Sequence, residues 1–579
     1  MTARLAHRAL PATPGDRGVQ RPGPMNMHKY RPYTPIGLPD RTWPDRRAEH
    51  APLWCSVDLR DGNQALADPM DVGRKRRMFD LLTGIGFKEI EVGYPTASRD
   101  DHAFVRHLVD TGAIPDDVVV QVMTPMREEF ISRTVSSLRG VPRAVLQVFN
   151  PTSEVQRRLV FRKDRAQILR MALEGAEQAL RLQDSLPGTE IYLQYAPESY
   201  TQTEPEYALE ICNAVLDLWA PRAAHTLRVN LPATVEVFPP QEFADRIEYV
   251  HRNLLHRERT LLSVHPHNDR GSGVAAAELA VLAGADRVEG TLFGNGERTG
   301  NVCLVTLAMN LFSQGVDPML DLRDIDAVRR VVESANRMPV PARHPWVGDY
   351  VYTSFAGSHQ DAIAKGLRAR SASEEDLWDV PYLPVDPQDV GRDYKALIRI
   401  NTQSGKGGIA HLLATDYGIE LPRRLQIDFA AVMQSVCERT GGEITSDELW
   451  KHFADTYVRP GVGGVEESGP LRAGRSPEEI EAWIAAGHGL RATVEGLTVT
   501  RSGEPLNAVT VACELVVDSR THWGVGMADD EAEALTRAVR AAARTATETL
   551  KTLPEPLGIA AEPRAVEART PQSHASEQR

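Results

Sequence analysis

Short β-branched or apolar segments and segments with helical spacing alternate eight times between residues 53 and 294, and this alternation is the strongest constraint on the fold. A short apolar segment followed by apolar positions three or four residues apart is typical of a strand followed by an amphipathic helix. The predicted strands cover residues 53–59, 88–93, 118–124, 143–150, 190–198, 226–233, 261–269 and 287–294.

Eight strand–helix units over a length of about 250 residues fill a closed (β/α)8 barrel. An open doubly wound sheet is the alternative, but such a sheet usually carries a glycine fingerprint after its first strand. No such fingerprint follows Leu59. We therefore predict an α/β fold in which residues 46–323 form a TIM barrel.

Helical spacing replaces this alternation after residue 323. Helices are predicted at residues 325–338, 359–370, 425–440 and 446–457, within a helical region that spans 324–460. A glycine-rich stretch and a short helix, residues 461–487, then lead to three predicted strands at 490–500, 507–518 and 521–527 and a final helix at 530–550. We predict a small α+β domain at residues 488–552.

The two ends of the chain lack apolar periodicity. Residues 1–50 hold eight prolines and eight arginines. Such a segment buries too little apolar surface to offset the entropy of ordering it, so we predict a disordered leader at residues 1–45. Residues 553–579 are also polar and proline-rich, and they are predicted to be a disordered tail.

Composition excludes several classes of protein. The chain has 66 basic and 79 acidic residues, a net charge of −13, which argues against a nucleic-acid partner. It has no run of about 18 apolar residues, so no membrane span is predicted. Its five cysteines lie far apart and form neither a disulfide framework nor a metal knuckle, which is typical of a cytoplasmic protein.

Polar residues gather where the predicted barrel strands end, which is where barrel enzymes carry their active sites. His265 and His267 point the same way from strand 7, because side chains two apart share a face. Asp61 follows strand 1 and Asn301 follows strand 8, so both are expected beside the two imidazoles. We predict a divalent metal site from these four residues, suited to Mg²⁺, Mn²⁺ or Zn²⁺.

Two further charged residues lie at the same rim. Arg60, within Asp58-Leu-Arg-Asp61, is predicted to face developing negative charge rather than solvent. Glu198 ends strand 5, where it either starts a helix or acts on a substrate. The glycines of 294–301 do not form a phosphate-binding loop, because the pattern GxxxxGK[ST] is absent.

Four motifs together resemble the 2-isopropylmalate synthase family, in its long actinobacterial form. This family belongs to the metal-dependent Claisen-condensing and lyase barrels with an Asp-Arg-Glu signature. The resemblance runs from about residue 30 to residue 457. The motifs are Asp58-Leu-Arg-Asp-Gly-Asn-Gln64, Leu231-Pro-Ala-Thr234, His265-Pro-His-Asn-Asp-Arg-Gly271 and Gly294-Asn-Gly-Glu-Arg-Thr-Gly-Asn301.

The resemblance implies a reaction in which acetyl-CoA, 3-methyl-2-oxobutanoate and water give 2-isopropylmalate and CoA, the first committed step of leucine biosynthesis. It implies Asp61, His265, His267 and Asn301 as ligands of a divalent metal, with Mg²⁺ favoured. It also implies a homodimer in which the helical region reaches the partner's barrel.

The resemblance also implies individual roles at the site. Arg60 would stabilise enolate or alkoxide charge, and Thr234 would hold the carboxylate of the oxo acid. Glu198 and His359 would share the acid–base work on the acetyl methyl group, with help from Tyr382. Gln64, Gln147 and Ala196 would complete the substrate pocket.

The sequence departs from the family pattern at two places. Close relatives usually carry His at position 147 and Ser at 196, whereas this chain has Gln147 and Ala196. A different or broader choice of 2-oxo acid is therefore an alternative. The leucine-sensing domain of the family has two βββα units, but residues 488–552 hold only one, so we expect weak or absent leucine inhibition.

Competing functions differ in features that the sequence carries. Homocitrate or citramalate synthases would use the same metal and base with another oxo acid. A hydroxymethylglutaryl-type lyase would lack the helical region that holds His359, and a biotin-dependent carboxyltransferase would bring a Met-Lys biotin site, which is absent. A catalytically inactive scaffold would have a broken metal triad, whereas Asp61, His265 and His267 are all present.

Overall fold

The computed structural model describes residues 25–354, 356–371, 377–392, 406–440, 444–459, 469–502 and 506–551. The predicted tail and the first 24 residues of the predicted leader lie outside this range. The chain divides into two compact units, Met1–Val351 and Tyr352–Arg579. None of the described helices is both long enough and apolar enough to span a lipid bilayer.

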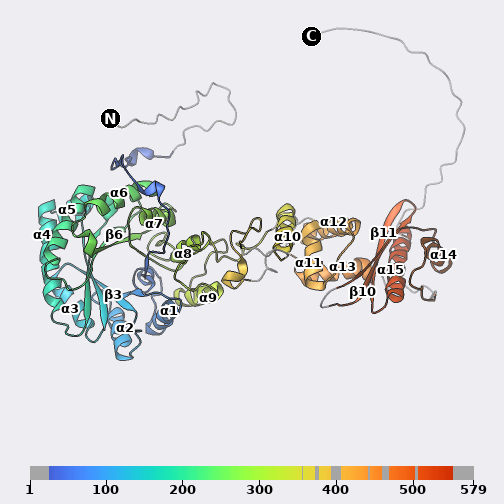
Figure 1. Cartoon of the computed structure of the whole chain (residues 1–579), viewed down its shortest axis with the longest axis horizontal. Helices are drawn as coiled ribbons and strands as arrows, with labels where there is room; N and C mark the ends of the chain where they lie inside the picture. The colour runs from blue at the N-terminus through green and yellow to red at the C-terminus, as the bar shows by residue number, and fades with distance from the viewer. Residues whose placement is uncertain are drawn as a thin grey trace, which may run out of the picture. The chain divides into compact units, whose positions relative to one another are not determined.

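The first unit is a closed barrel of eight parallel strands in chain order, ringed by helices (Figure 1). The strands are β1 Leu53–Ser56, β2 Glu89–Gly93, β3 Val119–Pro125, β4 Arg143–Pro151, β5 Glu190–Glu198, β6 Leu227–Ala233, β7 Thr260–Pro266 and β8 Arg287–Gly290. β1 pairs with β8 through Leu53↔Arg287 to Ser56↔Gly290, which closes the barrel. The predicted fold is confirmed.

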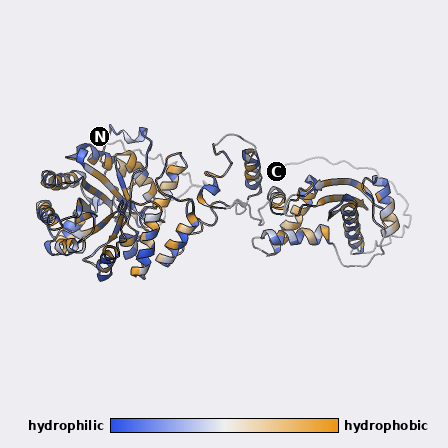
Figure 2. Cartoon of the chain, turned by 60° about the horizontal axis from the view of Figure 1, so that its bottom comes forward, coloured by the Kyte–Doolittle hydropathy of each residue, from blue (hydrophilic) through white to orange (hydrophobic). Residues whose placement is uncertain are grey.

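Within the described residues, this unit contains nine α-helices. They are α1 Val72–Gly84, α2 Arg99–Asp110, α3 Glu128–Ser137, α4 Arg165–Gln183, α5 Pro205–Trp219, α6 Pro240–Asn253, α7 Gly273–Leu282, α8 Leu304–Phe312 and α9 Ile325–Asn336. Local sequence sets several starts: Asp71 and Ser98 cap α1 and α2, and Asp164 forms a capping box with Gln167 at α4. The barrel strands are mostly hydrophobic, whereas the surrounding helices carry both hydrophilic and hydrophobic residues (Figure 2).

Strands β1, β7 and β8 end earlier than their apolar patterns predict. β1 stops at Ser56, and Asp58–Gly62 forms a π-helical turn in place of the last predicted strand residues. β8 stops at Gly290, before the turn in which Gly294 has a φ of 79°. Each shortened strand is followed by polar residues that turn over the barrel mouth. The early end of each strand therefore places functional groups at the rim.

The prediction of a disordered leader through residue 45 is wrong for its last part. Ile36 and Thr42 donate backbone N–H bonds to Glu242 and Glu248 of α6, at 3.1 and 2.9 Å. Trp43 is 8% exposed and donates its indole N–H to Asp245 at 2.7 Å. This segment is ordered by buried carboxylates some 200 positions away, which local proline content does not reveal.

We expect Trp43→Ala to lower the free energy of unfolding of the barrel by about 3 kcal/mol, because it removes a buried indole and leaves Asp245 without that donor. Trp43→Phe, which keeps most of the packing, should cost about 1 kcal/mol. Urea unfolding followed by circular dichroism measures both. An unchanged unfolding midpoint in Trp43→Ala would show that the segment does not contribute to the barrel.

The second unit begins with helices and ends in a small α+β domain. Its helices are α10 Gly357–Ser371, α11 Lys406–Tyr417, α12 Arg423–Thr440, α13 Ser446–Phe453 and α14 Pro477–His488; α11 was not predicted. The sheet has the order β11-β10-β9, with β9 Thr493–Arg501, β10 Val509–Val517 and β11 Arg520–Ala528, and α15 Glu531–Lys551 packs on it.

The segment predicted as a linker with a separate short helix is partly built into this domain. Leu471, Ile480 and Ile484 share one buried core with residues of β10 and α15. α15 lies directly on the sheet at Gly524 and Gly526, where no side chain separates the two backbones. A Cβ at these positions would stand only 2.1 or 2.0 Å from a backbone oxygen of the helix. The boundary predicted at residue 488 is therefore too late, and the described residues of the domain begin at residue 469.

Candidate active site

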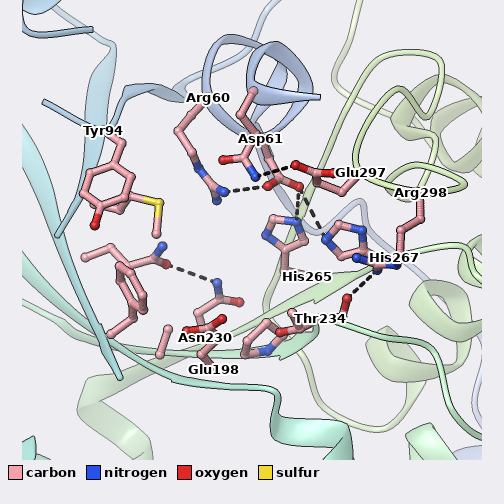
Figure 3. Close-up of a pocket in the computed structure, with 16 residues that line it drawn as sticks. Arg60, Asp61, Tyr94, Glu198, Asn230, Thr234, His265, His267, Glu297 and Arg298 are labelled. Atoms are coloured by element: carbon pink, nitrogen blue, oxygen red, sulfur yellow. Dashed lines mark hydrogen bonds and ion pairs between the residues drawn. The ribbon is translucent and has the colours of Figure 1, made fainter. Parts of the chain in front are cut away.

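A cavity of about 340 Å³ opens at the carboxyl ends of the barrel strands (Figure 3). Nine of its lining residues were predicted from the sequence: Arg60, Asp61, Gln64, Gln147, Ala196, Glu198, Thr234, His265 and His267. Seven residues from five different strands or loops complete the lining: Tyr94, Met123, Phe149, Asn230, Pro232, Glu297 and Arg298.

Asp61, His265 and His267 form a compact cluster at one side of the cavity. The Nε2 atoms of His265 and His267 lie 3.5 and 3.4 Å from Oδ2 of Asp61, and one ligand atom from each residue lies within 4.8 Å of the others. The two rings are parallel, with centroids 5.4 Å apart. Oδ1 of Asn301 stands 2.7 Å from Nε2 of His265, so all four predicted ligands converge.

Two buried polar atoms of this cluster have no hydrogen-bond partner, namely Oδ2 of Asp61 and Nδ1 of His267. A buried carboxylate oxygen left without a partner is costly unless a cation or a donor satisfies it. Oδ2 of Asp61 faces the Nε2 atoms of both imidazoles, and the donor set of one carboxylate, two imidazoles and one amide oxygen suits a divalent ion. The residues therefore fit a metal.

The electrostatics of the cluster favour positive charge at this position. Burial opposes protonation of His265, but the neighbouring carboxylates of Asp61 and Glu289 outweigh burial and raise its pKa to about 10. Burial and the charge of His265 lower the pKa of His267 to about 4. Although burial alone would raise the pKa of Asp61, the Arg60 guanidinium holds it well below its usual range.

Arg60 is clamped between two carboxylates at the mouth of the barrel. Its Nε donates to Glu91 and its Nη1 to Asp61, both at 2.6 Å. Because both partners are buried, the guanidinium is held in one orientation beside the metal cluster, with little freedom to move. The π-helical turn Asp58–Gly62 brings Arg60 and Asp61 to this position together.

Glu198 ends β5 on the opposite wall of the cavity. Burial raises the pKa of its carboxyl, and the charge of Arg60 offsets part of that increase. The next residue, Ser199, has a φ of 62°, a backbone conformation that non-glycine residues rarely adopt. Its N–H donates to Oγ1 of Thr234 at 3.0 Å, so this strained turn links the ends of β5 and β6.

Arg298 joins three loops at the rim. It donates to the carbonyl oxygen of Thr234 at 2.5 Å and to Asp269 through Nε at 2.5 Å, and its own φ is 60°. Thr234 is thereby fixed both through its hydroxyl and through its backbone. Gln64 lies at the outer edge of the cavity, where its amide donates to Glu297 at 3.4 Å.

The floor of the cavity is polar at Gln147 and apolar at Ala196. Oε1 of Gln147 accepts hydrogen bonds from Gln194 at 2.5 Å and from Asn230 at 3.1 Å. Both floor residues are buried, with exposed fractions of 3% and 4%. The two departures from the family pattern therefore lie on adjoining strands β4 and β5, where Gln147 pairs with Gln194 and Ala196 pairs with Phe149, and both line the cavity.

His359 and Tyr382 belong to the second unit and do not line the cavity formed within the first. Their rings stack with centroids 4.0 Å apart and an interplanar angle of 20°. Both side chains are exposed, and Tyr382 has a φ of 65°. The structure thus brings these two predicted residues together, and their part in the reaction stays a prediction.

Four of the residues that sequence reasoning missed share one signal. Tyr94 directly follows β2, and Met123, Phe149 and Asn230 lie near the ends of β3, β4 and β6. The rule that located His265 applies equally to these strand ends. They were overlooked because they are apolar or uncharged and carry no chemistry by themselves.

Comparison with known proteins identifies the family. A family model described as HMGL-like matches residues 51–332, and one described as alpha-isopropylmalate synthase, post-catalytic domain-like, matches residues 349–414. Enzymes of the HMGL-like family use a divalent metal, in agreement with the cluster above.

Full-length relatives extend this match over most of the chain. The 2-isopropylmalate synthase of Parafrankia sp. (strain EAN1pec) is 54% identical over 495 residues, 85% of this chain and 87% of the relative. The enzyme of the same name from Rhodospirillum rubrum is 49% identical over 545 residues, 89% of this chain and 98% of the relative. That from Mycobacterium ulcerans (strain Agy99) is 48% identical over 566 residues, 90% of this chain and all of the relative. The chain therefore belongs to the 2-isopropylmalate synthase family of acyltransferases.

Proposed function

We propose that this chain condenses acetyl-CoA with 3-methyl-2-oxobutanoate and hydrolyses the product to 2-isopropylmalate and CoA, in leucine biosynthesis. One carbon–carbon bond forms between the acetyl methyl carbon and C2 of the oxo acid, and water cleaves the thioester. The observation that carries the proposal is the convergence of Asp61, His265 and His267 beside Arg60 and opposite Glu198, in one cavity.

Asp61, His265, His267 and Asn301 would hold the divalent ion, with Mg²⁺ as our first choice and Mn²⁺ or Zn²⁺ as alternatives. A divalent ion supplies Lewis-acid polarisation of the keto group of the oxo acid. Asn301 is suited to this place because its amide N–H donates to the carbonyl of Asn295 at 3.0 Å, which leaves Oδ1 directed at His265.

Protein side chains would carry the remaining steps. Thr234, fixed by Ser199 and Arg298, would bind the carboxylate of the oxo acid. Glu198 would take the proton from the acetyl methyl group, since a carboxylate with a raised pKa is a stronger base. Arg60, which stays charged between Glu91 and Asp61, would face the negative charge that develops on the enolate.

We further propose that His359 and Tyr382 assist this acid–base chemistry. We also propose that the working form is a homodimer whose helical region reaches the partner's barrel. The stacked arrangement of the two rings supports a joint role, because it holds the imidazole and the phenol beside each other. Size-exclusion chromatography with light scattering measures the oligomeric state, and a monomer with full activity would contradict the proposed dimer.

The choice of oxo acid is the first experiment. Free CoA is measured with 3-methyl-2-oxobutanoate, pyruvate, 2-oxobutanoate and 2-oxoglutarate as acceptors. The proposal expects the highest kcat/KM with 3-methyl-2-oxobutanoate. A clear preference for another acceptor would assign the chain to a related synthase, and Gln147→His and Ala196→Ser would then test whether the cavity floor sets that preference.

We expect weak or absent inhibition by leucine. The described residues of the C-terminal domain contain one βββα arrangement, β9 to β11 followed by α15, preceded by the single helix α14. Inhibition requires that leucine bind two conformations with different affinities, and a site with fewer contacts makes that difference smaller. Initial rates at subsaturating oxo acid and leucine up to the millimolar range measure the effect, with valine as the control. Strong inhibition specific to leucine would contradict this prediction.

A further inference from the structure

Glu289 is a fully buried carboxylate of β8 that lies beneath the cavity and does not line it. Its Oε2 lies 2.9 Å from Nδ1 of His265 and accepts a hydrogen bond from Asn230, also at 2.9 Å. Its Oε1 accepts from Gln194 at 2.9 Å and from the guanidinium of Arg287. All of these partners are themselves buried, so the carboxylate is held by a complete set of donors.

The contact with His265 determines which ring nitrogen is available as a ligand. A neutral imidazole has one N–H donor and one lone-pair nitrogen, and an acceptor fixed at Nδ1 keeps the proton there. Nε2, which faces Asp61 and Asn301 at 3.5 and 2.7 Å, is then the nitrogen whose proton a metal ion would replace. His267 is held differently, because its buried Nδ1 has no hydrogen-bond partner. The orientation of the metal cluster therefore depends most on His265 and its carboxylate.

The other contacts of Glu289 lead to the floor of the substrate cavity. The amide N–H groups of Asn230 donate both to Glu289 and to Oε1 of Gln147, at 2.9 and 3.1 Å. Gln194 bridges the same two residues, at 2.9 and 2.5 Å. Two amides thus connect Glu289 to Gln147, and Asn230 itself lines the cavity.

We propose that Glu289 is a positioning residue that serves both parts of the site: it orients His265 toward the metal and holds the amides that form the cavity floor. Carboxylates that hydrogen-bond a histidine ligand fix its orientation and increase its basicity, and their loss typically weakens metal binding about 10- to 100-fold. The metal part of this inference needs only the cluster, whereas the cavity-floor part rests on the proposed function.

The test compares Glu289→Gln with Glu89→Gln in the full chain. Glu89 is a matched control because it is also buried and also bonds Arg287, at 2.7 Å, but its other bond goes to Arg228. Each variant is stripped with a chelator and titrated with Mn²⁺ by calorimetry. We expect the Kd for Mn²⁺ to rise about 10- to 100-fold in Glu289→Gln and to stay near the wild-type value in Glu89→Gln. An unchanged Kd in Glu289→Gln, or equal weakening in both variants, would overturn the inference.

Glu289→Asp keeps the test decisive if Glu289→Gln does not fold. Aspartate retains the negative charge beside Arg287 but is one methylene shorter, so its carboxylate cannot hold His265 and Asn230 at the same distances. We expect weaker Mn²⁺ binding in this variant as well, with a smaller loss in thermal stability than in Glu289→Gln. A Kd for Mn²⁺ equal to that of the wild type would overturn the inference.

A second readout concerns the cavity floor. At saturating metal, Glu289→Gln should raise the KM for the oxo acid, whereas Glu89→Gln should leave it unchanged; an unchanged KM in Glu289→Gln would overturn the cavity-floor part. Metal titration requires no substrate, so it tests the role of Glu289 at His265 separately from the proposed condensation reaction. If the wild-type chain binds Mn²⁺ through this cluster but condenses no oxo acid, the proposed function fails while the role of Glu289 at His265 stands.

Discussion

Replacing His267 with alanine will abolish metal binding and turnover while leaving the barrel folded. The substitution removes one of three clustered ligands and leaves the ion with Asp61, His265 and the amide of Asn301. Because Lewis-acid stabilisation by a metal is worth several kcal/mol, we expect kcat/KM to fall on the order of 10³-fold or more. Calorimetric Mn²⁺ titration and CoA release measure the two effects.

His256→Ala is the control for this variant. His256 lies just before β7, with a partly exposed side chain that pairs with Asp217 at 2.9 Å, so its loss should change neither metal binding nor rate. Circular dichroism and the melting temperature establish that both variants are folded. Near-normal activity of His267→Ala after chelator treatment would show that the metal assignment is wrong.

Replacing Glu198 with glutamine will lower kcat about 10²- to 10⁴-fold, the usual contribution of a positioned general base. Glutamine has nearly the same shape but cannot accept the proton. Burial raises the pKa of this carboxyl, so the active, deprotonated form is lost at a higher pH than for an ordinary glutamate. Wild-type kcat/KM should therefore fall as the pH drops through that raised value, and the Glu198→Gln profile should lack this acid limb.

The matched control is Glu206→Gln, which alters a largely exposed carboxylate in the first turn of α5. Its rate and pH profile should equal those of the wild type. The double variant Glu198→Gln/His359→Ala should be little worse than the single Glu198→Gln variant if the two residues act as one unit. Multiplicative losses would assign them separate roles, and full activity in His359→Ala would remove His359 from the mechanism.

The barrel and its chemically distinctive rim were predictable because the signals are local. Apolar residues that recur about every 2 residues indicate strands, and those that recur about every 3.6 residues indicate helices. The spacing of His265 and His267 alone places both side chains on one face of a strand. β5 begins and ends at the predicted residues. The apolar continuation beyond β1 was misleading, because Asp58–Gly62 turns into a π-helix whose hydrogen bonds no side-chain period reveals.

Long-range contacts explain what the sequence did not reveal. The order of the segment around Trp43 depends on buried carboxylates of α6, more than 200 positions later. Glu289 lies outside the four motifs, and its importance emerges only when β8 closes the barrel and brings it to Nδ1 of His265. α14 was predicted as a helix, but its membership in the C-terminal core depends on Ile480 and Ile484 meeting α15 in space.

The most direct test of the central claim follows the acetyl carbon itself. The metal-stripped full chain is incubated with [2-¹³C]acetyl-CoA and 3-methyl-2-oxobutanoate, with and without added Mg²⁺, and the products are identified by mass spectrometry and NMR. The account predicts one ¹³C atom in 2-isopropylmalate, at the new methylene carbon, formed only when the metal is restored and absent from His267→Ala. Label in 2-isopropylmalate without a divalent ion, or labelled product in His267→Ala at the wild-type rate, would contradict it.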